Sequence, residues 1–174
     1  MNTTETRSTW MNLGVIPQTI LVLVLTIVTP MVIHLIPLSG PVPAGARVLP
    51  MFYAPLAGVL LLGWRVGFLA GILAPVVNHL ITGMPVWELV WLLSLELGIF
   101  TSWVWLLAKN RALIWVSGPL AYVLTKCISA PMIGLFQDTT PWTFWAGSIV
   151  NALPGLVILT VLTLLFVRYE QSHT

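Results

Sequence analysis

The stretch APVVNHLITGMPVWELVW, residues 74–91, places Asn78, His79 and Glu88 around a Gly-Met-Pro turn. Long apolar runs lie on both sides of this stretch. Glycine and proline are the residues that most strongly punctuate regular structure and mark turns. The stretch therefore predicts a tight hairpin between two apolar helices, with its polar side chains gathered at the hairpin end.

The whole chain has the composition of a protein embedded in a lipid bilayer. Its 174 residues are 58% hydrophobic and 7% charged, unlike an average soluble domain. Apolar runs of about 20 residues, the length that crosses a bilayer as a helix, recur along the sequence. We expect an all-α integral membrane protein that forms a single transmembrane domain over residues 1–174. Six transmembrane helices are predicted, over residues 14–37, 48–62, 66–82, 86–107, 113–135 and 142–167.

Basic residues predict the orientation of these spans. Six spans place both termini on one side, and that side then receives Arg7, Arg65, Lys109, Arg111 and Arg168. The opposite side receives Arg47 near the membrane. Because cytoplasmic connections carry an excess of Lys and Arg, we expect a multi-pass protein of the cell (plasma) membrane with both termini cytoplasmic. The outer connections are then 38–47, 83–85 and 136–141.

Three polar residues are predicted deep inside the membrane. Counted from the outer ends of their spans, Glu96, Lys126 and Asn151 all lie about 14 Å down, at about 1.5 Å per residue. Glu96 and Lys126 can therefore pair, with Asn151 close by. Ionisable residues within spans are costly and are functional candidates. Two interpretations stay open and can coexist: an ion pair that holds two helices together, or polar groups that bind a ligand.

A second polar layer is predicted nearer the outer surface. It holds His34, Asn78, His79 and Glu88, with Arg47, Gln137 and Asp138 from the outer loops. His79 can instead be an interfacial histidine that faces water. Most of the nine tryptophans fall near predicted membrane surfaces, where an aromatic belt is expected. Trp91 and Trp145 lie deeper and are candidates for stacking on a flat ligand. The predicted substrate-binding set is Arg47, Asn78, His79, Glu88, Trp91, Glu96, Lys126, Trp145 and Asn151.

Small residues at four-residue spacing lead into the third segment, at Gly63, Gly67 and Gly71 with Ala70 and Ala74 alongside. Ridges of this kind let helix backbones approach closely in membranes. The ridge predicts either tight packing within one subunit or docking onto another membrane subunit.

Motifs of soluble enzymes are absent from the sequence. It contains no G-x-x-x-x-G-K-[ST], no G-x-S-x-G and no H-E-x-x-H. Its single cysteine, Cys127, excludes a Cys-based metal cluster. We expect no enzyme activity, no catalytic or metal-binding residues, no cofactor and no nucleic-acid partner.

Residues 48–85, VLPMFYAPLAGVLLLGWRVGFLAGILAPVVNHLITGMP, resemble the S components of energy-coupling factor (ECF) transporters. The shared features are an L-P-M opening at 49–51, L-L-L-G at 60–63, Pro75 in a Gly/Ala-rich helix, and T-G-M-P at 82–85. The length and the six-span layout also resemble this family. At 52–53 the chain has Phe-Tyr, where relatives often place a His, so no ligand identity is carried over.

The resemblance implies a substrate-binding subunit of an ECF-type ABC importer. Such a subunit captures a vitamin or related small micronutrient at the extracellular face. Its partners are a transmembrane T subunit and two ABC-type ATPase subunits, which hydrolyse ATP. The alternative is a structural membrane protein of the MreD cell-shape type with no transported ligand. A membrane enzyme is a third class. The sequence shows no nucleophile-base pair that would support it.

Overall fold

The computed structural model describes residues 13–35, 44–133 and 140–172, and within these ranges every regular element is helical. Arg7 lies outside the described residues, as do the ends of two predicted spans, 36–37 and 134–135, and most of the predicted connections 38–47 and 136–141. The elements are α2 (Val15–His34), α3 (Ala44–Val48), η1 (Pro50–Phe52), α4 (Tyr53–Ala57), η2 (Gly58–Leu62), α5 (Trp64–Thr82), α6 (Trp87–Ala108), η3 (Ile114–Val116), α7 (Ser117–Ile133), α8 (Pro141–Asn151) and α9 (Leu153–Gln171).

Five of the described helices are long and apolar enough to cross a membrane. They cover Val15–Ile33, Trp64–Thr82, Trp87–Ala108, Ile114–Ile133 and Leu153–Gln171. This composition is that of a multi-pass membrane protein. The predicted second span, 48–62, is instead a shorter apolar helix, Pro50–Leu62, built from 3₁₀, α and π turns in succession. It falls short of the roughly 20 residues that a straight crossing requires.

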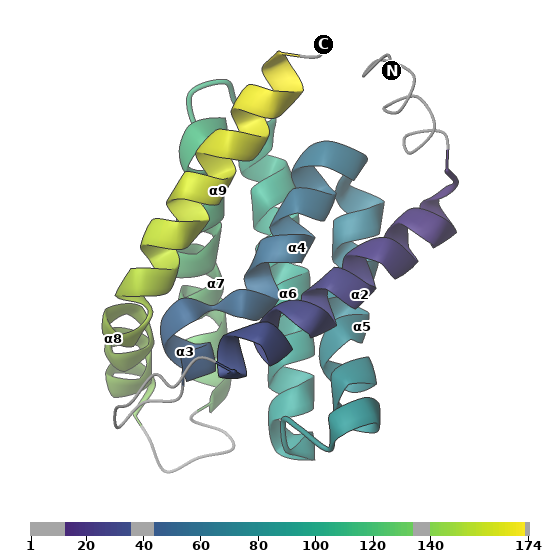
Figure 1. The fold of residues 1–174 in the computed structure, drawn as a ribbon. Helices are drawn as coiled ribbons and strands as arrows, with labels where there is room; N and C mark the ends of the chain where they lie inside the picture. The colour runs from purple at the N-terminus through teal and green to yellow at the C-terminus, as the bar shows by residue number, and fades with distance from the viewer. Residues whose placement is uncertain (1–12, 36–43, 134–139, 173–174) are drawn as a thin grey trace.

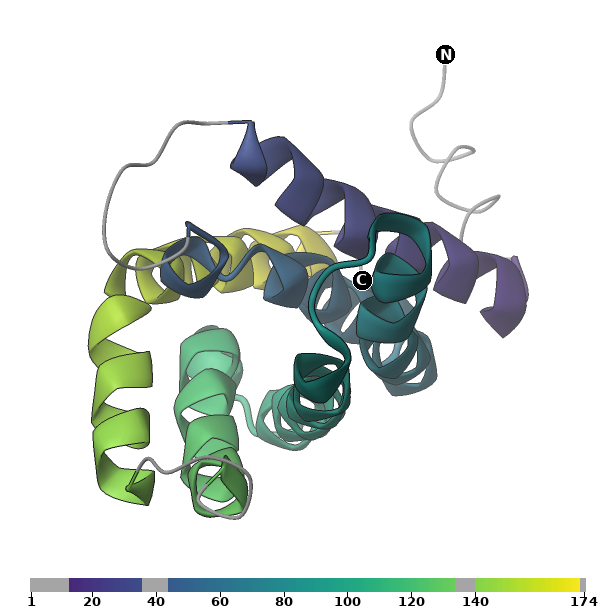
Figure 2. The same cartoon turned by 90° about the horizontal axis from the view of Figure 1, so that it is seen from below.

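The predicted sixth span, 142–167, is not one helix, and that prediction is wrong. The chain bends at Ala152, whose φ of −86° and ψ of 3° end α8, and α9 begins at the next residue. Pro154 lies in the first turn of α9. Proline is tolerated in a first turn but has no N–H and clashes with the preceding turn in a helix interior. Figure 2 shows α8 and α9 running in different directions from this bend.

The two ends of the bundle differ in what they hold. The α5–α6 hairpin, α3 and α8 lie at one end, which is the lower end in Figure 1. The α6–α7 connection, the start of α5 and the end of α9 lie at the opposite end. These upper segments include Arg65, Lys109, Arg111 and Arg168. The described basic residues that were predicted to share one side therefore belong to segments at one end of the bundle.

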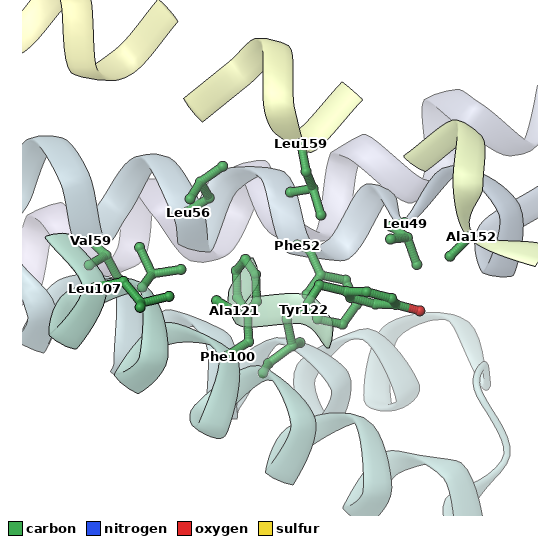
Figure 3. Packing of buried hydrophobic residues seen from close by; sticks show 12 residues of the cluster. Leu49, Phe52, Leu56, Val59, Phe100, Leu107, Ala121, Tyr122, Ala152 and Leu159 are labelled. Carbon is green, nitrogen blue, oxygen red and sulfur yellow. The ribbon is translucent and has the colours of Figure 1, made fainter. Parts of the chain in front are cut away.

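The core is centred on Phe52 of η1. Its ring lies edge-on to Phe100 of α6, with centroids 5.0 Å apart, and to Tyr122 of α7, at 5.3 Å. Figure 3 shows Leu159 of α9 pointing toward this group, with Leu56 beside it. Because lipid tails are as apolar as these side chains, close van der Waals packing holds such helices together in a bilayer. The short broken helix is thus a central wedge between α6, α7 and α9.

The small-residue ridge of α5 is used inside the chain. A Cβ on Gly67 would lie 2.5 Å from Val59 Cγ2, and one on Gly71 would lie 3.4 Å from Leu97 Cβ. Ala70 and Ala74 are fully buried. Gly63 has a different role, because its φ of 103° ends the π turn before α5 and favours glycine. Packing within one subunit is the interpretation that these contacts support.

Candidate ligand-binding site

The α5–α6 hairpin positions one edge of the site. Gly83 ends α5 in a left-handed conformation with φ of 72°, as glycines do at helix C-termini. Asn78 Nδ2 donates to the carbonyl oxygen of Met84 at 3.0 Å, and His79 Nδ1 lies 2.8 Å from the carbonyl oxygen of Pro85. The expected tight hairpin is confirmed. Both polar side chains predicted for the outer layer here contact the turn backbone.

A buried ion pair lies deeper on α6 and α7. Lys126 Nζ donates to both carboxylate oxygens of Glu96, at 2.6 and 2.8 Å. The Ser129 hydroxyl donates to Glu96 Oε1 at 2.7 Å. Glu96 is 1% exposed and Lys126 is 7% exposed. The predicted Glu96–Lys126 pair is confirmed, and its short, charge-assisted bonds are of the strong kind.

The ion pair lies in the wall of a cavity of about 660 Å³ at the hairpin end of the bundle. Residues of α2, α3, η1, α5, the hairpin, α6, α7 and α8 line it. Most of the lining is apolar, with the rings of Phe52 and Phe144 among it. The polar side chains of the lining are Asn78, Glu96, Tyr122, Lys126, Thr143, Ser148 and Asn151. A few oriented polar groups in an apolar pocket are typical of a small-molecule site.

Four of the nine predicted site residues share this cavity: Asn78, Glu96, Lys126 and Asn151. Asn151 is the last residue of α8 and lies just before the bend at Ala152. It reaches the cavity from this short helix and not from the continuous span predicted over 142–167. Its proximity to the ion pair was predicted from depth along a continuous helix. In the structure Asn151 and the ion pair line the same cavity, and Asn151 belongs to α8 instead of a continuous sixth span.

The other five predicted residues are not part of the cavity lining. Glu88 and Trp91 are exposed on α6, with Trp91 61% exposed. Glu88 therefore does not join Glu96 in the cavity wall. The His79 ring contacts Trp87, with centroids 5.0 Å apart. Trp145 stacks on Trp142 at 5.1 Å. Arg47 is half-buried on α3 and follows the lining residues Gly45 and Ala46.

Several residues of the site were missed, although the sequence held a signal for some of them. Ser129, which bonds to Glu96, follows Lys126 by three residues and so shares its helix face. Phe144 and Ser148 line the cavity and precede the predicted Asn151 by seven and three residues, which places all three on one face of α8. Tyr122 and Phe52 gave no such signal, because an aromatic residue in an apolar run is usually core. Their position in the cavity wall follows from the tertiary packing alone.

Metal ligation finds no support in the part of the chain that the structure describes, where no three His, Cys, Asp or Glu side chains are grouped to hold an ion. The fold and cavity define the class: an all-helical protein with five helices able to span a membrane and a pocket at one end. In comparisons with known proteins, no family model, no curated protein and no solved structure matches the chain.

Proposed function

We propose that the chain is the substrate-binding subunit of an ECF-type ABC importer and binds a vitamin or related small micronutrient in the cavity. The observation that carries the proposal is the cavity itself, about 660 Å³ with a buried ion pair in an apolar wall. The resemblance of residues 48–85 to S components adds to it. In this proposal the short helix Pro50–Leu62 completes a six-segment layout of the S-component type.

The proposal assigns the remaining tasks to partners. The chain is not an enzyme in this scheme, and its sequence contains no P-loop. A transmembrane T subunit and two ABC-type ATPase subunits supply the energy. The cavity end faces the outside of the plasma membrane, and the end with Arg65, Lys109 and Arg111 faces the cytoplasm with both termini, which agrees with the positive-inside rule.

A structural role of the MreD type is the second candidate, and one observation favours it. Glu96 and Lys126 already satisfy each other, and Ser129 adds a third hydrogen bond. A closed pair of this kind can hold α6 against α7 with no ligand present. Under this alternative the cavity binds nothing.

Gly147 offers a direct test of the cavity. It lines the cavity wall, and a Cβ added there meets no atom within 4 Å. A Gly147→Leu side chain is therefore expected to occupy ligand space without disturbing the fold. Gly14 is a matched control, since a Cβ there also meets nothing within 4 Å and it lies outside the cavity lining.

The experiment is native mass spectrometry of the purified full chain, with melting temperature as a second readout. We expect a small molecule to remain bound to the wild type and to Gly14→Leu, and to be lost from Gly147→Leu. Added ligand should raise the melting temperature of the first two proteins alone. A wild type that carries no molecule and responds to no vitamin contradicts the proposal, as does a Gly147→Leu variant that binds like the wild type.

A further inference from the structure

We propose that the cavity selects ligands that carry no net charge and that present a carbonyl oxygen or ring nitrogen to the Lys126 ammonium. This inference rests on the proposed function and specifies its substrate class. Amides, lactams and heterocycles with an exocyclic carbonyl meet the description. Carboxylates and amines of the same size do not.

The charges in the cavity wall balance each other. Among the lining residues that the structure describes, Glu96 and Lys126 are the two that bear a full charge. They contact each other at 2.6 Å and cancel. A ligand carboxylate would set two negative charges against one ammonium, and a ligand amine would set two positive charges against one carboxylate. Charge left uncompensated in a low-dielectric site is strongly unfavourable.

The ion pair leaves one hydrogen-bond donor of Lys126 unused. An ammonium has three N–H donors, and the two bonds to Glu96 use two of them. Glu96 is the more enclosed partner, at 1% exposed against 7% for Lys126, and also accepts from Ser129. The pair therefore offers the cavity a donor, and the matching group on a ligand is an acceptor.

Aromatic rings lie near the Lys126 ammonium. Lys126 Nζ lies 5.5 Å from the ring centroid of Tyr122 and 5.5 Å from that of Phe144. Both residues line the cavity, with Leu92 and Leu93 nearby in the wall. Aromatic rings of this kind favour contact with a flat, unsaturated ligand body. A planar ring that bears a carbonyl matches the donor and the rings together.

A matched probe series tests the inference by charge. Each ring is supplied as an amide, a carboxylate and an amine: benzamide, benzoate and benzylamine, and indole-3-acetamide, indole-3-acetate and tryptamine. The readout is the melting temperature of the purified full chain. We expect the amides to raise it more than the charged members of each set. A larger rise with the carboxylates or the amines overturns the inference and leaves the proposed function standing.

Two variants and a control connect that preference to the ion pair. Glu96→Gln keeps an acceptor for Ser129 and leaves Lys126 as the charged lining residue, so preference should move to the carboxylates. Glu88→Gln makes the same change at an exposed site on the same helix and should keep the amide preference. An amide preference that Glu96→Gln does not alter overturns the inference.

The double variant Glu96→Gln/Lys126→Met keeps the test available if Glu96→Gln does not fold. Its lining is neutral, so it should still prefer amides, with roughly tenfold to a hundredfold weaker binding from loss of the charged donor. Unweakened amide binding by the double variant overturns the role given to Lys126. If no probe stabilises the wild type and no molecule purifies with it, the proposed function fails and the inference fails with it.

Discussion

The two halves of α7 meet their neighbours in different ways. Near its start, Gly118 lets α9 approach so closely that an added Cβ would lie 2.3 Å from Thr163 Oγ1. The Thr163 hydroxyl donates to the Leu159 carbonyl of its own helix at 2.6 Å. Near its end, Lys126 and Ser129 bond across to α6, and a cavity opens beside them. At the first half of α7, small side chains and a hydroxyl that bonds within its own helix allow close helix packing. At the second half, the long charged side chain of Lys126 bonds to a partner on another helix, and space remains beside it.

The largest effect is expected from breaking the ion pair. Lys126→Met leaves the Glu96 carboxylate buried without its counter-charge, which should cost about 3–5 kcal/mol of unfolding free energy. Glu96→Gln should also be strongly destabilising, because it leaves the Lys126 ammonium unpaired. Equilibrium unfolding in mixed detergent micelles measures both values. Glu88→Gln, at an exposed position of the same helix, should change the free energy by less than about 0.5 kcal/mol.

The double variant Glu96→Gln/Lys126→Met measures how far the two residues depend on each other. Removing both charges avoids an unpaired ion, so its loss of stability should be smaller than the sum of the two single losses by at least about 0.5 kcal/mol. If the loss of the double variant equals the sum of the two single losses, the residues contribute independently. The contrast between the two halves of α7 would then have no energetic basis.

An intermediate effect is expected from one substitution made at a closed and an open position. An added Cβ on Gly67 would lie 2.8 Å from the Pro55 carbonyl oxygen and 2.8 Å from the Val59 backbone nitrogen, and backbone atoms cannot easily move aside. Gly67→Ala should therefore cost about 1–3 kcal/mol. Gly147→Ala, which meets no atom within 4 Å, should be neutral or stabilising by up to about 1 kcal/mol.

The same unfolding measurement compares the two alanine variants. The informative result is the difference in sign or size between their changes in unfolding free energy. Equal destabilisation at Gly67 and Gly147 would contradict the distinction between a close-packed region and an open cavity wall.

The smallest effect is expected at the connections between helices. Asn78, 8% exposed, donates to the Met84 carbonyl at one end of the bundle. Asn110, which is exposed, accepts from the Ala112 amide at the other end, at 2.9 Å. Asn78→Ala should cost about 1 kcal/mol, as for a buried hydrogen bond. Asn110→Ala should cost less, because water can replace its contact. The reverse order would show that the hairpin bond does not stabilise the cavity end.

Prediction from sequence worked best where one local rule acted alone. The long apolar runs gave α2, α5, α6 and α7 within a few residues, and the Gly-Met-Pro signal gave the hairpin. The helices within residues 48–62 and 142–167 were harder to predict. Apolar content alone does not show a change of helix type or of helix direction. Pro154 indicated the bend in the sequence. No residue indicated the left-handed backbone of Leu49, whose φ is 58° just before η1.

Composition and apolar runs were enough to predict an all-helical chain rich in apolar spans, with a few polar residues at defined depths. The Glu96–Lys126 pair followed from depth, because opposite charges on neighbouring helices at one level must find each other in a medium that cannot solvate them. Which polar residues share the cavity depends on the tertiary packing. Rotation around α6 turns Glu96 inward and leaves Glu88 exposed, and the bend at Ala152 lets α8 form part of the cavity wall. The rotation of α6 and the bend at Ala152 depend on how neighbouring helices pack. The spacing of residues along one helix does not determine that packing.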